Sequence, residues 1–212
     1  MSHLISSASD EALQALTSQG ILVSRPQVEE IISSLLGYPS FAALISEHDK
    51  RSDEPGLDEA EVLVLDHPSA DAKAAVVLPT MSSSAIFQVV VACAQAIAEC
   101  SGVTVFDDVD ELFNSWVSGE LAMIIPHSEE VDPALLESMG PVEVADEWTA
   151  NESLWASDTE WTIEAKAEMR EADAAPGQQA VLDCVGYMKF RKAGRAGLLV
   201  HEGGASCALR AS

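Results

Sequence analysis

The sequence has few basic residues. Its 212 residues include 11 Lys and Arg against 35 Asp and Glu, so the formal net charge is −24 at pH 7. Proteins that bind nucleic acids directly neutralise phosphates with clustered Lys and Arg. The charge balance therefore predicts no direct nucleic-acid binding. The composition, 48% apolar and 22% charged, is that of a chain that buries a core.

Long apolar runs are also lacking. The longest nearly uninterrupted one, residues 86–98, contains two glutamines and is shorter than the roughly 20 residues of a membrane-spanning helix. The N-terminus has neither the positive region nor the apolar region of a secretory signal. We therefore expect a cytoplasmic protein without a membrane span, in which the four cysteines stay reduced.

Motifs for metal binding and catalysis are missing. The sequence contains no Cys-x-x-Cys, His-x-x-x-His, phosphate-binding Gly-x-x-x-x-Gly-Lys or Gly-x-Ser-x-Gly. We expect no catalytic residue, metal or cofactor, and we expect four buried structural thiols. These thiols are Cys93, Cys100, Cys184 and Cys207. The alternative is a small metal-dependent enzyme whose site the fold assembles from His67, His127 or His201 with nearby acids such as Asp66, Glu129 and Glu130.

A stretch of polar and turn-forming residues predicts the domain organisation. A polar stretch around Pro55 and Gly56 has the composition of a linker. We expect a small helical module at 1–50, a linker at 51–60 and an α/β domain at 61–212 that ends in an antiparallel sheet. Within 1–50, Ser9 and Ser24 are candidate caps of two helices, and a third helix is expected at 41–47.

The larger domain shows two kinds of periodicity. Apolar patterns predict strands at 61–65, 103–106 and 121–125, and helices at 82–100, after Asp107, and up to Met139. Strict alternation over 161–170 then predicts a half-exposed strand. Two more strands, at 180–192 and 196–202, flank a hairpin turn at 193–195. The predicted fold class is α+β: an N-terminal three-helix module, a central α/β layer and a C-terminal antiparallel β-meander at about 158–207.

The string Leu-Gly-Tyr-Pro-Ser-Phe-Ala-Ala-Leu at 36–44 fits the pattern LGYxSFxAL. It resembles a short helical module that precedes varied C-terminal domains in bacterial proteins of plasmids and integrative elements, some of them glyoxalase-related. The resemblance implies a mobile-element setting. It implies no glyoxalase activity, because the metal-binding residues of that domain have no counterparts in this chain.

The acidic residues are concentrated in one part of the chain. Residues 101–173 contain 19 Asp and Glu against 2 Lys and Arg, and three of the four tryptophans in this stretch lie close together at 148, 155 and 161. Tryptophan anchors surrounded by carboxylates are typical of an interface for a basic partner. The candidate partner-binding residues are Asp107, Asp108, Asp110, Glu111, Glu129, Glu130, Asp146, Glu147, Trp148, Trp155, Asp158 and Glu160.

Simpler interpretations stay open for these residues. Acids at a helix start interact favourably with the positive end of the helix dipole, which explains the acids at 107–111 without a partner. Tryptophans at strand ends can belong to the core.

Three functional hypotheses follow. The first is a non-catalytic acidic binding protein that occupies the basic surface of a nucleic-acid-handling protein, as a nucleic-acid mimic or anti-CRISPR-like inhibitor of a host defence complex would. The second is the metal-dependent enzyme described above. The third is a structural or regulatory subunit that forms a homodimer through the edge of the meander. High acidity that serves only solubility is the simplest alternative to all three.

Overall fold

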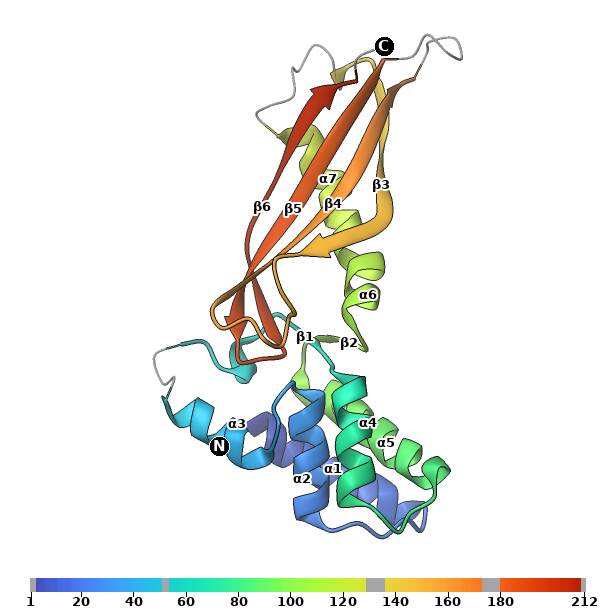
Figure 1. The fold of residues 1–212 in the computed structure, drawn as a ribbon, viewed down its shortest axis with the longest axis vertical. Helices are drawn as coiled ribbons and strands as arrows, with labels where there is room; N and C mark the ends of the chain where they lie inside the picture. The colour runs from blue at the N-terminus through green and yellow to red at the C-terminus, as the bar shows by residue number, and fades with distance from the viewer. Residues whose placement is uncertain (1–2, 51–53, 129–135, 173–179, 211–212) are drawn as a thin grey trace. The chain divides into compact units, whose positions relative to one another are not determined.

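The computed structural model describes residues 3–50, 54–128, 136–172 and 180–210 (Figure 1). The chain divides into two compact units, and each is assembled from separate parts of the sequence. The first unit comprises Met1–Val109, Leu154–Thr159 and Lys192–Leu199; the second comprises Asp110–Ser153, Glu160–Arg191 and Val200–Ser212.

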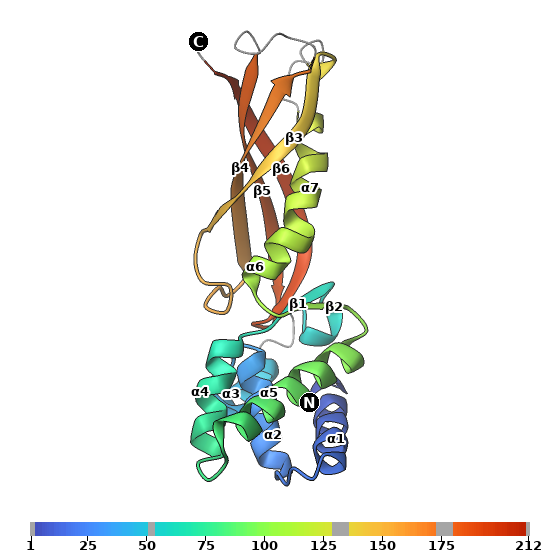
Figure 2. The same ribbon diagram turned by 90° about the vertical axis from the view of Figure 1, so that its right-hand side faces the viewer.

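The first unit is mainly helical. Its elements are α1 (His3–Ser18), α2 (Arg25–Leu35), α3 (Phe41–Lys50), the short helix η1 (Leu57–Glu59), β1 (Val62–Val64), α4 (His67–Val77), α5 (Ser83–Ser101) and β2 (Thr104–Phe106). Helix α5 lies against α1, α2 and α4 (Figure 2). Its buried residues include Val89, Val90, Cys93 and Ile97. The core of this unit therefore forms around α5.

Local sequence signals explain where these helices begin. The Ser24 backbone N–H donates to the Gln27 side chain at 2.9 Å ahead of α2, and Pro26 occupies the first turn. The Ser82 hydroxyl accepts from the Ala85 N–H at the start of α5. Strands β1 and β2 pair in parallel, with α4 and α5 between them in sequence. This is the α/β part of the fold.

The second unit contains four long strands and a helical segment. Its elements are α6 (Val109–Leu112), η2 (Phe113–Val117), α7 (Ser118–Ile124), η3 (Ile125–His127), β3 (Met139–Ala150), β4 (Glu160–Glu171), β5 (Val181–Ala193) and β6 (Gly197–Leu209). The complete strand order is β2-β1-β6-β5-β4-β3. The described chain is therefore α+β with a six-stranded mixed sheet. Strands β5 and β6 contribute residues to both units.

The helical segment covers one face of the β3–β6 sheet (Figures 1 and 2). Alternate residues of β4, from Trp161 to Met169, are buried, and Trp161 is 1% exposed. A Cβ at Gly186 on β5 would lie 3.1 Å from Leu121 and 3.2 Å from Ile125, so the sheet needs a residue without a side chain where α7 approaches. The opposite face of the sheet is open and carries most of the charged residues of β4 and β5.

Several sequence predictions are confirmed. Strands β1 and β2, helix α5 and strands β4, β5 and β6 all occur where periodicity placed them, although β6 extends to Leu209 rather than ending at 202. The α+β class is confirmed. Three predictions of local structure are wrong. Ser9, predicted to cap a helix, lies inside α1 and is buried. Residues 121–125, predicted as a strand, belong to α7 and η3, because they continue a helical segment that begins at Val109. Met139, predicted at the end of a helix, begins β3, a strand that periodicity missed.

The predicted boundary at 51–60 does not separate two domains. Leu57 and Ala60, in the predicted linker, are 8% and 6% exposed and belong to the same hydrophobic core as α1 and α5. The N-terminal helices therefore share one unit with residues that follow the linker, because α1 covers an apolar face of α5.

The prediction of four free thiols is also wrong. Cys184 on β5 and Cys207 on β6 form a disulfide, with their Cα atoms 4.1 Å apart. The neighbouring strands β5 and β6 bring these two positions together. Cys93 and Cys100 are free. Burial raises the pKa of the Cys93 thiol to about 12, so this thiol is protonated and unreactive at neutral pH.

In the described part of the chain one helix, α5, is long and apolar enough to cross a membrane. This finding concerns length and composition only. Core helices of soluble proteins pass the same test. Most of one side of α5 is buried in the core of the first unit.

Candidate partner-binding groove

Four of the predicted partner-binding residues line one groove of the second unit. They are Asp110, Asp146, Glu147 and Trp148. The other lining residues are Thr149, Glu164, Ala165, Lys166 and Val185, and the groove has a volume of about 720 Å³. The structure therefore brings together residues that lie nearly 40 positions apart in the sequence.

An irregularity in β3 shapes this groove. The pairing of β3 with β4 shifts register between Val144 and Trp148, and such a bulge bends the strand and redirects its side chains. Asp146 and Glu147 lie within the shifted stretch and are exposed. Trp148 pairs with Ala165 of β4, a small residue that leaves room for the indole ring. We call these nine lining residues the Trp148 groove.

Contacts from the helical segment hold Trp148 in place. Its indole Nε1 donates a hydrogen bond to the Asp110 carboxylate at 2.9 Å, and the Phe113 ring lies 6.3 Å away between centroids, tilted by 34°. The indole is half-buried. A tryptophan held at both its polar and its apolar parts is a rigid element on the surface, which loses little entropy when a partner binds.

Negative charge in the Trp148 groove is not compensated. Among the described residues, none forms an ion pair with Asp146, Glu147 or Glu164. Of the lining residues that the structure describes, Lys166 alone is cationic, against four carboxylates. Carboxylates beside an indole ring attract Arg and Lys side chains, through charge-assisted hydrogen bonds and cation–π contact.

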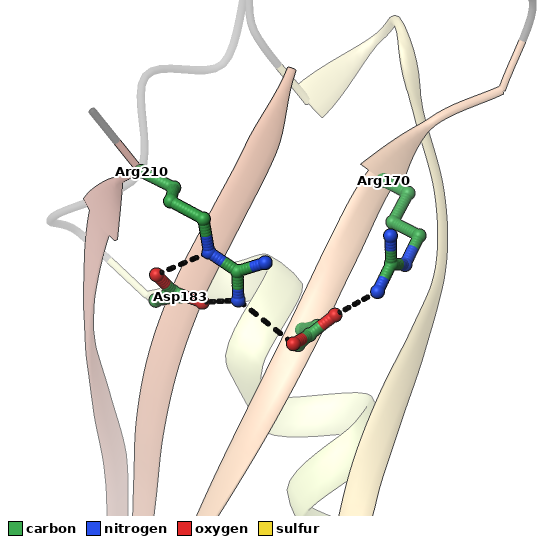
Figure 3. Close-up of polar contacts among 4 residues, drawn as sticks. Arg170, Asp183 and Arg210 are labelled. Carbon is green, nitrogen blue, oxygen red and sulfur yellow. Dashed lines mark hydrogen bonds and ion pairs between the residues drawn. The ribbon is translucent and has the colours of Figure 1, made fainter. Parts of the chain in front are cut away.

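A second charged cluster on the same sheet shows the contrast (Figure 3). Arg210 near the C-terminal end donates through Nε to Asp183 at 2.9 Å and through Nη2 to Glu168 at 2.8 Å, and Arg170 pairs with Glu168. Hydrogen bonds from Arg210 lower the pKa of both carboxyl groups. Two arginines thus neutralise two acids, and we call this cluster the Arg210 clasp. It has no excess charge to offer a partner.

The other predicted residues are not in the Trp148 groove. Asp107, Asp108, Trp155 and Asp158 belong to the first unit. The Asp107 carboxylate lies 3.3 Å from His67 Nε2. Glu111 is in the first turn of α6, as the helix-start interpretation predicts, and Glu160 pairs with Lys189 at 3.1 Å. Glu129 and Glu130 lie outside the described residues.

Trp155 and Trp161 have structural contacts. Trp155 Nε1 donates to the Val64 carbonyl at 3.2 Å, and its side chain lies over Gly37. Trp161 Nε1 donates to the Glu152 carbonyl, and its ring lies 5.7 Å from that of Phe190 in the core. Trp148 is therefore the best interface candidate of the three.

The histidines proposed for a metal site have other neighbours. His127 Nδ1 lies 2.9 Å from the Met123 carbonyl within its own helical segment. His67 contacts Asp107. Within residues 3–50, 54–128, 136–172 and 180–210, no group of three His, Cys, Asp or Glu side chains has the arrangement of a metal site.

Sequence reasoning missed Glu164 and Lys166 of the Trp148 groove. Both lie on the polar side of the alternating stretch 161–170, which does predict that they face away from the core. The sequence did not reveal that β3 would pair beside them, because β3 itself was not predicted.

The LGYxSFxAL string has a structural role in the first unit. The Tyr38 hydroxyl accepts from the Arg195 N–H at 3.2 Å, and the Arg195 guanidinium lies 5.4 Å from the Tyr38 ring centroid. Arg195 also pairs with Glu47 of α3 at 2.9 Å. The Trp155 side chain packs directly against Gly37. The string thus holds the β5–β6 turn and the β3–β4 connection against α2 and α3.

In comparisons with protein-family models, curated proteins and solved structures, none matches this chain.

Proposed function

We propose that this protein is a non-catalytic binding protein whose Trp148 groove engages a basic surface of a nucleic-acid-handling protein. The observation that carries the proposal is a group of three carboxylates, Asp146, Glu147 and Glu164, which form no ion pair with the described residues and lie beside a fixed indole ring. Such basic surfaces bind the phosphates of DNA or RNA through Arg and Lys side chains. A group of carboxylates competes with the phosphates for the same side chains.

The net charge supports the same partner class. At −24 the chain attracts cationic surfaces over distances of about a Debye length, roughly 8 Å at physiological salt. The resemblance of residues 36–44 to a mobile-element module fits a protein that acts against a host complex. The specific proposal is an inhibitor of a nucleic-acid-handling defence complex that occupies the site of its DNA or RNA.

Two triple variants with equal net charge test this proposal. The groove variant carries Asp146→Asn, Glu147→Gln and Glu164→Gln; the control carries Glu11→Gln, Asp71→Asn and Glu99→Gln, three exposed acids of the first unit. Each changes the net charge from −24 to −21. Each protein is used to capture partners from a bacterial lysate at physiological salt, followed by mass spectrometry.

We expect the wild type and the control to retain a nucleic-acid-binding protein that the groove variant binds at least tenfold more weakly. A DNA or RNA oligonucleotide should displace this partner, and rising salt should weaken the complex. Equal retention by both variants would show that net charge alone attracts the partner. A complex that ignores both salt and oligonucleotide would contradict the mimicry.

A further inference from the structure

The indole ring of Trp148 gives the Trp148 groove a flat aromatic wall of fixed orientation. Its Nε1 donates to Asp110 of α6, and the ring lies beside Phe113, which is 1% exposed. The residue opposite it on β4 is the small Ala165. Both Trp148 and Ala165 line the groove, so part of the ring is accessible to a partner. A flat ring that is held in place is suited to stacking against a flat cation.

The four carboxylates of the groove come from three elements. Asp110 lies on α6, Asp146 and Glu147 lie on the irregular part of β3, and Glu164 lies on β4. Carboxylates on separate elements reach an occupant from more than one direction. An occupant that bonds to more than one of them therefore needs several N–H donors that point in different directions.

Lys166 does not neutralise these acids. On β3, residues 145–147 bulge opposite this single residue of β4. Lys166 is therefore next to Asp146 and Glu147 in the sheet, yet within the described parts of the chain its ammonium forms no ion pair with either. On its other side it pairs with Val185 of β5, an apolar residue that is 41% exposed. The acids stay available to a cation from a partner.

Arginine meets these requirements better than lysine does. The guanidinium is planar, carries five N–H donors in a fixed fork and stacks on aromatic rings. Stacking on an indole leaves the edges of the guanidinium free for in-plane hydrogen bonds to carboxylates. The lysine ammonium is a compact, strongly hydrated charge without a flat face, so it cannot combine the two kinds of contact.

We propose that the Trp148 groove selects arginine over lysine in its basic partner. The guanidinium stacks on the indole, and its N–H groups donate to Asp146, Glu147 or Glu164. This selectivity rests on the proposed function, which makes the occupant of the groove basic. It goes further, because attraction by charge alone predicts equal binding of arginine and lysine. Arginine forms the bidentate contacts of nucleic-acid-binding proteins to phosphates and to guanine, and these are the side chains that the groove would cover.

Three fluorescent octapeptides of equal charge test this selectivity. In each, glycine alternates with one basic residue, which is arginine, lysine or asymmetrically dimethylated arginine. Dimethylation keeps the charge of the guanidinium but blocks its bidentate hydrogen bonds. Binding to the full chain is measured by anisotropy at physiological salt. The groove variant and the control variant described above serve as references.

We expect the arginine peptide to bind about fivefold more tightly than the lysine peptide, because it alone combines stacking with bidentate hydrogen bonds. The dimethylarginine peptide should bind at least about twofold more weakly than the arginine peptide, since it loses those hydrogen bonds. In the groove variant the preference for arginine should fall to about twofold or less, whereas the control variant should keep it.

Indole resonances show where the arginine peptide binds. The chain has four tryptophans, and the indole N–H signal of Trp148 in a ¹H–¹⁵N spectrum is identified by its loss in Trp148→Phe. The arginine peptide should shift this signal. The indole signals of Trp155 and Trp161 should stay unchanged, because these two residues donate to backbone carbonyls away from the groove.

Equal affinity for the arginine and lysine peptides would overturn the selectivity and leave the proposed function standing, because a basic partner would still bind. Failure of every peptide to bind, an unmoved Trp148 signal, or an arginine preference that persists unchanged in the groove variant would also overturn it. Selective arginine binding together with failed partner capture would count against the proposed function only.

Discussion

Gly37 shows how strongly a single position of the first unit is constrained. Its φ is +79°, in the left-handed region, and a Cβ there would lie 2.5 Å from Cδ1 of Trp155. Gly20 has a similar φ of +75°, but a Cβ at that position would meet nothing within 4 Å. The two glycines therefore separate the cost of the backbone conformation from the cost of a collision.

We expect Gly20→Ala to lower the free energy of unfolding by about 1 kcal/mol, the cost of a left-handed alanine. Gly37→Ala should lower it by about 3 kcal/mol, because displacement of the Trp155 ring adds an overpacking cost. Urea denaturation of both variants measures the difference. Equal losses would show that Trp155 moves away from Gly37 at no cost.

At the scale of residues, the sequence indicated which side chains are candidates for an interface, but it did not indicate which of them lie next to one another. It singled out Asp110, Asp146, Glu147 and Trp148 as an interface, and the structure gathers these four in one groove. It grouped with them residues such as Trp155, whose indole donates to a backbone carbonyl in the first unit. Local composition cannot separate these cases, because the difference depends on strand pairing between distant segments.

At the scale of elements, the Arg210 clasp links β4, β5 and the C-terminal end of β6 through ion pairs at one end of the sheet. Glu168 and Asp183 are directly opposite each other, and like charges in that position repel. Arg210 contacts both and lowers their pKa values below the usual 4.5 and 3.8. Carboxyl groups with lowered pKa in the folded state stabilise it above their unfolded pKa, and the contribution disappears as the pH falls through the folded pKa.

We therefore expect Arg210→Gln to lower Tm at pH 7, and the deficit to shrink as the pH falls below about 4. Protonation removes both the repulsion and the ion pairs, so the two proteins should converge in acid. Thermal melting between pH 7 and pH 2.5 measures this. A deficit that stays constant over that range would mean that Arg210 acts through packing rather than charge.

The spacing of apolar residues predicted helices and strands correctly where one face of the element is buried, and it failed for the elements without this pattern. The alternation at 161–170 gave β4 because its apolar side meets the helical segment. Residues 121–125 are apolar on all sides, a pattern that strands and helices share. β3 was missed because its bulge interrupts alternation. The Cys184–Cys207 disulfide could not be predicted, because a turn at 193–195 would place Cys184 opposite Gly204 and the expected strand ended at 202, before Cys207.

For the whole molecule, 35 acids against 11 basic residues repel one another and lower the stability of the folded state. Self-repulsion opposes compact states, and salt screens it: the Debye length falls from about 30 Å at 0.01 M to about 10 Å at 0.1 M. Ion pairs between exposed side chains, such as Lys189–Glu160, act in the opposite sense and contribute little.

We therefore expect Tm to rise when NaCl increases from about 0.01 M to about 0.1 M. The rise should be smaller in the control variant with a net charge of −21, described above. Calorimetry of both proteins across this range provides the measurement. A fall in Tm with salt would mean that specific ion pairs outweigh the general repulsion.

The division of β5 and β6 between the two units has a consequence for biosynthesis. The first unit is complete only with Lys192–Leu199, so a ribosome must translate past residue 199 before the N-terminal helices receive their final strand. Until then, apolar surface of β1 and of the neighbouring helices stays uncovered on the nascent chain. Neither unit corresponds to a contiguous stretch of sequence, and a chain that ends before Lys192 would contain neither one intact.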